Sequence, residues 1–427
     1  MRILVDQSGH DLQNMGDIAM LQSCVSRLLG QWPDADITVI ARSAALLAEF
    51  CPDASPIWRA SDRRLARCLP GRYRSLWQTT VPYLSARIAG RRVSLSQPRT
   101  ALQAVRAADA VVAAGGGYFT DVWRWQAMGV LGNLSMAQRL GKPTAMFGQG
   151  IGPIRNRLLR RQARAVLPRL AVLGLREGLM SRDLALSLGA RPSAVTVTGD
   201  DALELIADDG ILGGDALGIN LRITRYAGVD RAAAAAIGAA IVAEAAALAA
   251  PVVALPVSRH PVESDIESIR CMLRAGRPPA DAVPRDLSTP EALARAAAGC
   301  RAIVTGSYHG AVFGLAKGVP CVCLTNSRYY DGKFTGLRAL FPETCRVIPL
   351  DSPGFDVSLR TAIRQAWNIP VPLRAAARVA ATQQRAAGRA AYAQFRDMIT
   401  GTLSPGVPLN AGRYPVLRAE KEQNERT

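Results

Sequence analysis

Histidine is scarce in this chain, and each of its three histidines follows a segment with the pattern of a buried strand. They are His10, His260 and His309. The segment IVTGSYHGAVFGLAKGVP (303–320) predicts a strand, a turn and a helix that begins near His309. An imidazole at such a turn can transfer a proton near neutral pH. We therefore expect His309 to be catalytic, with a purely structural role as the alternative.

Metal binding is a rival use of these histidines. The HxH and HExxH patterns and paired Cys and His ligands are not found in the sequence. We predict no metal site and no cofactor.

Two arginines end predicted strands, where a substrate could reach them. Arg222 is in GINLRIT, and Arg176 is in GLREGLMSRD. A guanidinium can hold a carboxylate or phosphate through two parallel hydrogen bonds. A structural ion pair is the alternative for each. Lys333, in YYDGKF, follows a further predicted strand.

Glycine-rich segments follow three predicted strands. They are AGGGYF, with Gly115 to Gly117, GQGIGP at 148–153, and SGHDLQNMGD, which contains Asn14, Gly16 and Asp17. Glycine turns let a ligand approach the backbone, and amide groups there can bind an anion. Such turns at the carboxyl ends of neighbouring parallel strands would line one crevice. A tight turn without a ligand, and a helix cap at Asp17, are the alternatives.

The elements that position these residues alternate between short apolar runs and helical patterns. This alternation is typical of parallel sheets covered by helices. The sequence predicts an N-terminal Rossmann-like domain over 1–205, a linker at 206–216, a second Rossmann-like domain over 217–370, a helical segment at 371–404 and a mobile tail at 405–427. The predicted strands are Ile3–Val5, Ile37–Ile40, Ala110–Ala114, Thr144–Phe147, Ala171–Leu175, Val195–Thr198, Gly218–Leu221, Val252–Leu255, Ala302–Thr305, Cys321–Leu324 and Arg346–Pro349.

Composition limits the class of protein. The 427 residues are 49% hydrophobic and 20% charged, which excludes a wholly disordered or collagen-like chain. The formal net charge is +18, a field that attracts phosphates, acidic glycans or an anionic membrane face. The eight cysteines form no CxxC pair and predict buried thiols in a reducing compartment. Asp6 interrupts the first apolar run, so we expect a cytoplasmic protein.

Two segments are unusually basic. Residues 59–99 contain ten arginines and one acidic residue, with aromatic residues interleaved, and residues 155–169 contain six arginines and no acidic residue. Such segments suit an anionic membrane surface, and peripheral association with the inner face of the membrane is left open. An ordinary solvated helix face is the alternative. Nucleic acid is an unlikely partner because no helix-turn-helix, RNP or zinc pattern accompanies the charge.

Eight motifs in this order resemble the polysaccharide pyruvyl transferase family. The resemblance implies an α/β, GT-B-like fold, in which two Rossmann-like parallel-sheet domains face each other across a cleft. It also implies transfer of a pyruvyl group from phosphoenolpyruvate to hydroxyls of a glycan or lipid-linked saccharide, which forms a cyclic ketal and releases phosphate. The motifs are NMGD (14–17), AGGGYF (114–119), GQGIGP (148–153), LRE (175–177), TGDDA (198–202), GINLR (218–222), SYHGAVFGLAKGVP (307–320) and YYDGK (329–333).

The resemblance also implies roles for single residues. His309 would be the general acid, and Arg222 would bind the donor. The further expected substrate-binding residues are Asn14, Gly16, Asp17, Gly115, Gly116, Gly117, Tyr118, Gln149, Gly150, Arg176, His260, Ser307, Tyr308, Gly310 and Lys333.

One position departs from the family pattern. Members often carry a basic residue two positions before the histidine, where this chain has Ser307. The donor anion then needs another partner, for which Arg222, His260 and Lys333 are candidates. A GT-B glycosyltransferase that uses a nucleotide sugar, and a non-catalytic glycan-binding relative, are the alternative functions.

Overall fold

The computed structural model describes residues 1–7, 9–57, 101–206, 214–224, 226–261, 264–275 and 287–401. The arginine-rich segment 59–99, most of the predicted linker and the tail beyond residue 401 lie outside the described residues. Predictions made for these segments therefore stay predictions.

The first half of the chain forms a parallel sheet in the order β3-β2-β1-β4-β6-β7-β8, with β5 paired to β6. Its strands are short and apolar, so they can be buried on both faces by helices. Ile3 of β1, for example, pairs with Ile37 on one side and Ala110 on the other. The strands are β1 (Arg2–Asp6), β2 (Asp36–Ile40), β3 (Ala54–Ile57), β4 (Ala110–Ala113), β5 (Gly116–Phe119), β6 (Thr144–Ile151), β7 (Val172–Leu175) and β8 (Val195–Val197).

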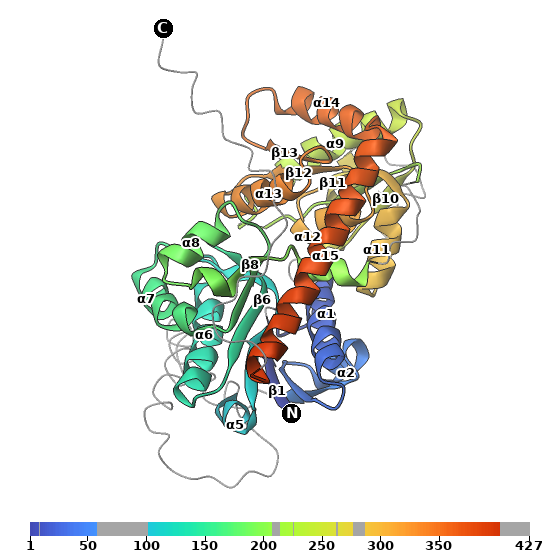
Figure 1. The fold of residues 1–427 in the computed structure, drawn as a ribbon. Helices are drawn as coiled ribbons and strands as arrows, with labels where there is room; N and C mark the ends of the chain where they lie inside the picture. Colours follow the sequence, from blue (N-terminus) through green and yellow to red (C-terminus); the bar gives the residue numbers. More distant parts are fainter. Residues whose placement is uncertain are drawn as a thin grey trace.

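Helices connect these strands and cover the sheet (Figure 1). Polar side chains fix where several of them begin: Asn14 accepts hydrogen bonds from the Gly16 and Asp17 amides, and Asn156 accepts them from Leu158 and Leu159. The helices are α1 (Met15–Gln31), α2 (Ala44–Phe50), α5 (Ala101–Ala107), α6 (Arg124–Arg139), α7 (Arg157–Val166) and α8 (Ser181–Ser187), with the short 3₁₀ helices η1 (Leu167–Arg169), η2 (Pro192–Ala194) and η3 (Asp201–Leu205).

The second half forms a separate parallel sheet in the order β10-β9-β11-β12-β13. Both predicted sheets are therefore present, and their strands match the predicted ranges closely. The strands are β9 (Ala216–Asn220), β10 (Val252–Ala254), β11 (Cys300–Thr305), β12 (Cys321–Thr325) and β13 (Cys345–Pro349). The helices are α9 (Arg231–Ala247), α10 (Asp265–Ala275), α11 (Pro290–Ala298), α12 (Tyr308–Ala316), α13 (Arg328–Leu340), α14 (Phe355–Trp367) and α15 (Val371–Ile399).

The interpretation of two glycine-rich segments as turns is wrong. Gly116 and Gly117 lie in β5, and β6 continues through Gly148 and Gly150 to Ile151. Close packing explains two of these glycines, because a Cβ at Gly148 would lie 3.0 Å from Cγ of Asp201 and one at Gly117 would lie 2.2 Å from Nζ of Lys333. The backbone at Gly148 is also left-handed, with φ of +56°.

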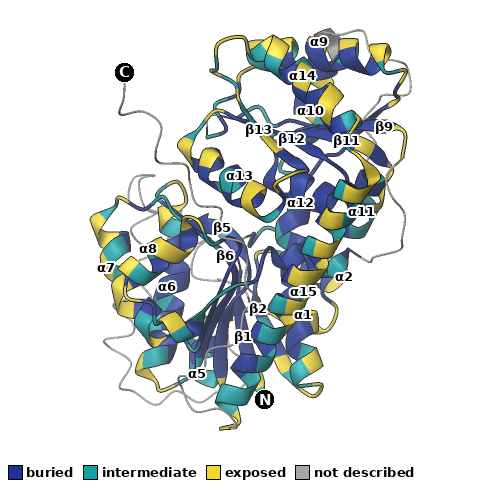
Figure 2. Ribbon diagram, turned by 45° about the horizontal axis from the view of Figure 1, so that its top comes forward, coloured by how far each residue is buried: buried dark blue, intermediate teal, exposed yellow. Residues whose placement is uncertain are grey.

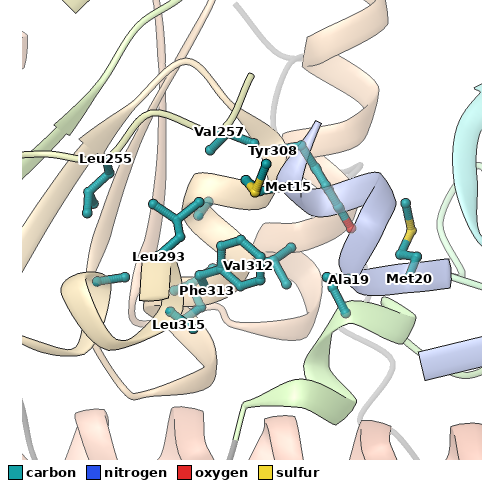
Figure 3. Packing of buried hydrophobic residues seen from close by; sticks show 14 of the residues in the cluster. Met15, Ala19, Met20, Leu255, Val257, Leu293, Tyr308, Val312, Phe313 and Leu315 are labelled. Atoms are coloured by element: carbon teal, nitrogen blue, oxygen red, sulfur yellow. The ribbon is translucent and has the colours of Figure 1, made fainter. Parts of the chain in front are cut away.

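The two halves share buried surface. Helix α15 runs from the second sheet down to the first (Figure 1) and packs against α12, α1, β6 and β7. Figure 2 shows buried residues continuing from one half into the other. Figure 3 shows one apolar cluster that joins Met15 and Ala19 of α1 to Val312 and Phe313 of α12. Apolar side chains from the two halves of the chain therefore pack against each other.

Among the described helices, none combines the length and the hydropathy that a membrane span requires. The seven described cysteines are unpaired, and all but Cys271 are buried. Burial raises the pKa of the Cys24 thiol to about 12, so this side chain stays a neutral thiol.

Candidate active site

The strand orders show where a ligand would bind. The order reverses between β1 and β4 in the first sheet and between β9 and β11 in the second. Ligands of open parallel sheets bind beyond the carboxyl ends of strands at such reversals. A cavity of about 230 Å³ lies there, lined from both halves by Gly9, Asp11, Gln13, Asn14, Asp17, Gly117, Tyr118, Trp123, Gln126, Arg176, Arg222, Tyr226, Ser258, His260, Ser307, Tyr308, His309, Tyr329, Tyr330 and Lys333.

His309 is held in the first turn of α12, after the N-cap residue Ser307. It comes from the second half of the chain but faces the first half. Its Nε2 lies 3.5 Å from Oδ2 of Asp200, and the side chain is only 10% exposed. A Cβ at Gly16 would lie 2.0 Å from its Nδ1, so only glycine leaves room for the imidazole at the start of α1.

Asp200 connects His309 to Arg176. Its Oδ1 accepts a hydrogen bond of 2.8 Å from the Ala202 amide, and its Oδ2 lies 2.9 Å from Nε of Arg176. Burial alone would raise the pKa of Asp200, but the charge of Arg176, followed by that of His309, outweighs it and lowers the pKa to about 2. Asp200 is therefore a carboxylate at any physiological pH.

Arg222 is anchored by a second buried carboxylate. Its Nε lies 2.6 Å from Oδ1 of Asp265, and its Nη1 donates to the Tyr226 hydroxyl at 2.8 Å. Asp265 also accepts hydrogen bonds from the Val257 and Ser258 amides, which fix its position. A third donor of Arg222, on Nη2, lies 3.2 Å from Asp265, so two of its five N–H groups stay available to a ligand.

Lys333 reaches the cavity from α13. Its Nζ hydrogen-bonds the Tyr329 hydroxyl and lies 3.9 Å from the centre of the Tyr329 ring. Among the described residues, no carboxylate lies within ion-pair distance of this amine. Burial, followed by the charge of Arg176, lowers the pKa of Lys333 well below its usual value. An anion bound in the cavity would supply the missing partner.

The structure brings most of the expected site residues together. Eleven of the seventeen line the cavity. They are Asn14, Asp17, Gly117, Tyr118, Arg176, Arg222, His260, Ser307, Tyr308, His309 and Lys333.

The other six do not line it, and packing accounts for several of them. A Cβ at Gly115 would lie 2.8 Å from Sδ of Met20, and one at Gly310 would lie 2.7 Å from Oγ1 of Thr305. Gln149 is buried and donates to the Ala114 and Phe147 carbonyls. Gly116 lies inside β5, Gly16 makes room for His309, and Gly150 lines a smaller neighbouring pocket.

Several cavity residues were not predicted. Asp200 was not predicted either: it contacts the cavity residues Arg176 and His309 without lining the cavity itself. It follows β8 by three residues, in the quoted motif TGDDA, and its place near the carboxyl end of a predicted strand could have identified it. Tyr329 and Tyr330 stand in the quoted motif YYDGK, whereas Trp123 and Tyr226 lie outside the quoted motifs and had no comparable signal. Trp123 and Tyr226 come from different halves, and their ring centres lie 5.6 Å apart.

In the described part of the chain, no three His, Cys, Asp or Glu side chains gather as a metal ion would require. The absence of a metal from the reaction stays a prediction.

Two kinds of comparison match this chain, a family model and solved structures. A family model described as polysaccharide pyruvyl transferase matches residues 14–328. No curated protein sequence matches the chain.

Solved structures resemble it at low identity. A putative UDP-N-acetylglucosamine 2-epimerase from Listeria monocytogenes has a TM-score of 0.58 and 11% identity, covering 95% of this chain and 98% of that one. A ugt transferase from Siraitia grosvenorii in complex with UDP has a TM-score of 0.55 and 12% identity, covering 93% and 99%. The UDP-GlcNAc 2-epimerase from Methanocaldococcus jannaschii has a TM-score of 0.52 and 12% identity, covering 86% and 92%. These likenesses show the GT-B-like fold and nothing of the reaction.

Proposed function

This chain belongs to the polysaccharide pyruvyl transferase family, and we propose on that basis that it moves a pyruvyl group from phosphoenolpyruvate to two hydroxyls of a saccharide. The product is a cyclic pyruvate ketal, and phosphate is released. The observation that carries the proposal is the convergence of Arg176, Arg222, Lys333 and His309 on one small cavity between the two sheets.

The charges of the cavity suit the donor. Phosphoenolpyruvate carries a carboxylate and a phosphate, and both need cationic or amide donors. Arg222 has N–H groups left after binding Asp265, and the Lys333 amine has no described carboxylate beside it. Together they take the place of the basic residue that Ser307 replaces.

The reaction needs a proton at the donor methylene carbon. His309 supplies it, which turns CH₂ into CH₃ and makes the adjacent carbon electrophilic. Two acceptor hydroxyls form C–O bonds to that carbon, and the C–O bond to phosphate breaks. Of the two hydroxyl protons, one replaces the proton that His309 gave and the other leaves with the phosphate. General acid catalysis of this kind contributes about 10²–10⁴-fold in rate.

Activity on defined substrates tests the proposal. The purified protein is incubated with phosphoenolpyruvate and a panel of saccharides, and mass spectrometry is used to find the ketal while phosphate release is measured. His309→Gln is expected to lose most turnover at an unchanged melting temperature. Release of a nucleoside diphosphate from a sugar nucleotide, with no ketal, would instead support the glycosyltransferase alternative. Saccharide binding without either product would support a non-catalytic relative.

The acceptor and the site of action are part of the same proposal. A glycan or lipid-linked saccharide is the expected acceptor, and an anionic membrane surface is the expected partner of the basic segments. Of these segments only 155–169 is described, where α7 exposes Leu158 to 62% among its arginines. An amphipathic basic helix of this kind suits an anionic interface.

A further inference from the structure

Two buried polar atoms in the candidate active site face each other without a hydrogen bond. They are Nε2 of His309 and Oδ2 of Asp200, which lie 3.5 Å apart. The Nε–H of Arg176 does not satisfy Oδ2, because it points to the Gly148 carbonyl at 3.0 Å. A buried polar atom without a hydrogen bond is energetically unfavourable. A shift of a few tenths of an ångström would pair these two atoms and remove both penalties.

We propose that Asp200 is a positioning residue that holds the hydrogen of His309 on Nε2 and thereby makes Nδ1 the nitrogen that serves the substrate. This inference rests on the proposed function for its catalytic consequence, but its structural part does not. The residue pair also crosses the cleft, since Asp200 belongs to the first half of the chain and His309 to the second.

The assignment of the hydrogen follows from the charge of Asp200. A carboxylate can only accept hydrogen bonds, so its partner nitrogen must carry a hydrogen. Nε2 is buried, whereas the His309 side chain lines the cavity, so Nδ1 is the nitrogen left for a ligand. When the ring is protonated, Nδ1–H is the acid and Asp200 stabilises the positive charge.

Among the described groups around the His309 imidazole, Asp200 is the one that decides which ring nitrogen carries the hydrogen. Gly16 of α1 presents only backbone beside Nδ1, and Tyr308 and Phe313 of α12 contribute rings at 5.5 Å and 6.4 Å. The charged or titratable groups that line the same cavity are Asp11, Asp17 on α1, Arg176 after β7, Arg222 after β9, His260 and Lys333 on α13. Only Asp200 lies within ion-pair distance of His309 in the described structure.

Asp200→Asn is expected to move the hydrogen of the neutral His309 ring to the other nitrogen. The Ala202 amide needs an oxygen at the Oδ1 position, so the amide NH₂ of asparagine would take the Oδ2 position. That group donates, and Nε2 must then accept, which moves the hydrogen of the neutral ring to Nδ1. The substitution keeps the side-chain shape but selects the other tautomer and removes the countercharge.

Nuclear magnetic resonance of protein labelled with ¹⁵N-histidine reads this tautomer directly. The chain has only three histidines, and loss of one signal set in His309→Gln assigns His309. At a pH where the ring is neutral, the wild-type protein is expected to show Nε2 protonated and Nδ1 unprotonated. Asp200→Asn is expected to show the opposite tautomer and a fall in turnover of at least about 10²-fold, with a smaller change in donor KM.

Glu177→Gln is the matched control. Glu177 is a buried carboxylate beside Arg176 that caps α8 through the Met180 and Ser181 amides and makes no contact with His309. Its replacement should leave the His309 tautomer unchanged. The wild-type spectrum alone can overturn the inference, because a spectrum in which all three histidines carry their hydrogen on Nδ1 would contradict it even if every variant failed to fold.

The two proposals fail separately. The expected tautomer without ketal formation would remove the proposed function and keep the role of Asp200. Ketal formation by a protein whose His309 carries its hydrogen on Nδ1 would do the reverse.

Discussion

Two arginines of the cavity, which could bind a donor, are each held in place by a buried carboxylate. Arg176 is held by Asp200, and Arg222 by Asp265, at 2.9 Å and 2.6 Å. A buried carboxylate of this kind orients a guanidinium before substrate arrives, which lowers the cost of binding. The sequence left a structural ion pair and a functional arginine as alternatives. The structure shows the ion pair at both positions, and the functional role stays a prediction.

Arg222→Lys tests whether Arg222 binds the donor. A lysine can keep one contact with Asp265, but its ammonium lacks the planar pair of parallel N–H groups with which a guanidinium binds a carboxylate or phosphate. The donor KM should rise by about 10-fold or more, with a smaller change in kcat. Steady-state kinetics with varied phosphoenolpyruvate measures this, and an unchanged donor KM would place Arg222 outside the donor site.

Lys333→Met should make the empty protein more stable. Attraction to the tyrosine rings favours the charged amine, but burial and Arg176 outweigh it and lower its pKa. The lysine therefore holds its proton more tightly in the unfolded chain than in the folded chain. This difference opposes folding at pH values below the ordinary lysine pKa.

Melting temperatures from pH 7 to pH 10 measure the effect. The gain of Lys333→Met over wild type should be largest at the lower pH and should shrink toward pH 10, because the unfolded lysine then loses its proton as well. A lower melting temperature at every pH would contradict the expected sign. Donor binding should weaken in the same variant.

At the scale of elements, close helix packing decides what a glycine does. Gly238 lies in α9, where a Cβ would come within 2.0 Å of the Met272 carbonyl oxygen of α10. Gly30 lies in α1 with no atom within 4 Å of the same position. Both are helical, so their intrinsic propensities are alike, and only the neighbouring helix differs.

The two alanine substitutions should therefore have opposite signs. Gly30→Ala should stabilise the protein by about 0.5–1 kcal/mol through helix propensity. Gly238→Ala should destabilise it by about 1–3 kcal/mol, because backbone of α10 must move away. Denaturant unfolding compares the two, and stabilisation by Gly238→Ala would show that α9 and α10 are not packed as described.

At the scale of the whole molecule, a charge network that is buried at Arg27 and Asp201 joins helix α15 to the first half. Arg27 of α1 binds Asp201 at 2.6 Å and Glu204 at 2.8 Å, and Glu204 also binds Arg389 of α15. Tyr392 of α15 donates to Asp201 at 3.2 Å. The neighbouring residue of Asp201 is Asp200, so the network that fixes α15 also fixes the turn that faces His309.

Arg27→Met is expected to cost about 3–5 kcal/mol of unfolding free energy, because it leaves the buried Asp201 carboxylate without its charged partner. Arg270→Met is the matched control, since its pair with Glu267 is exposed and should be worth about 0–1 kcal/mol. Denaturant unfolding of both variants measures the difference. Equal small losses would show that the network does not hold α15 in place.

Local sequence patterns were enough to predict the two parallel sheets, most strand positions and the residues at the strand ends. These follow from local patterns, because apolar runs and glycine or capping residues act over a few positions. The tertiary structure alone decided that glycines 116, 117, 148 and 150 lie in strands, and that Asp200 meets His309. Asp200 and His309 are 109 positions apart, and Gly116 pairs with Gln149, 33 positions further on. No local pattern encodes which residues meet over such separations.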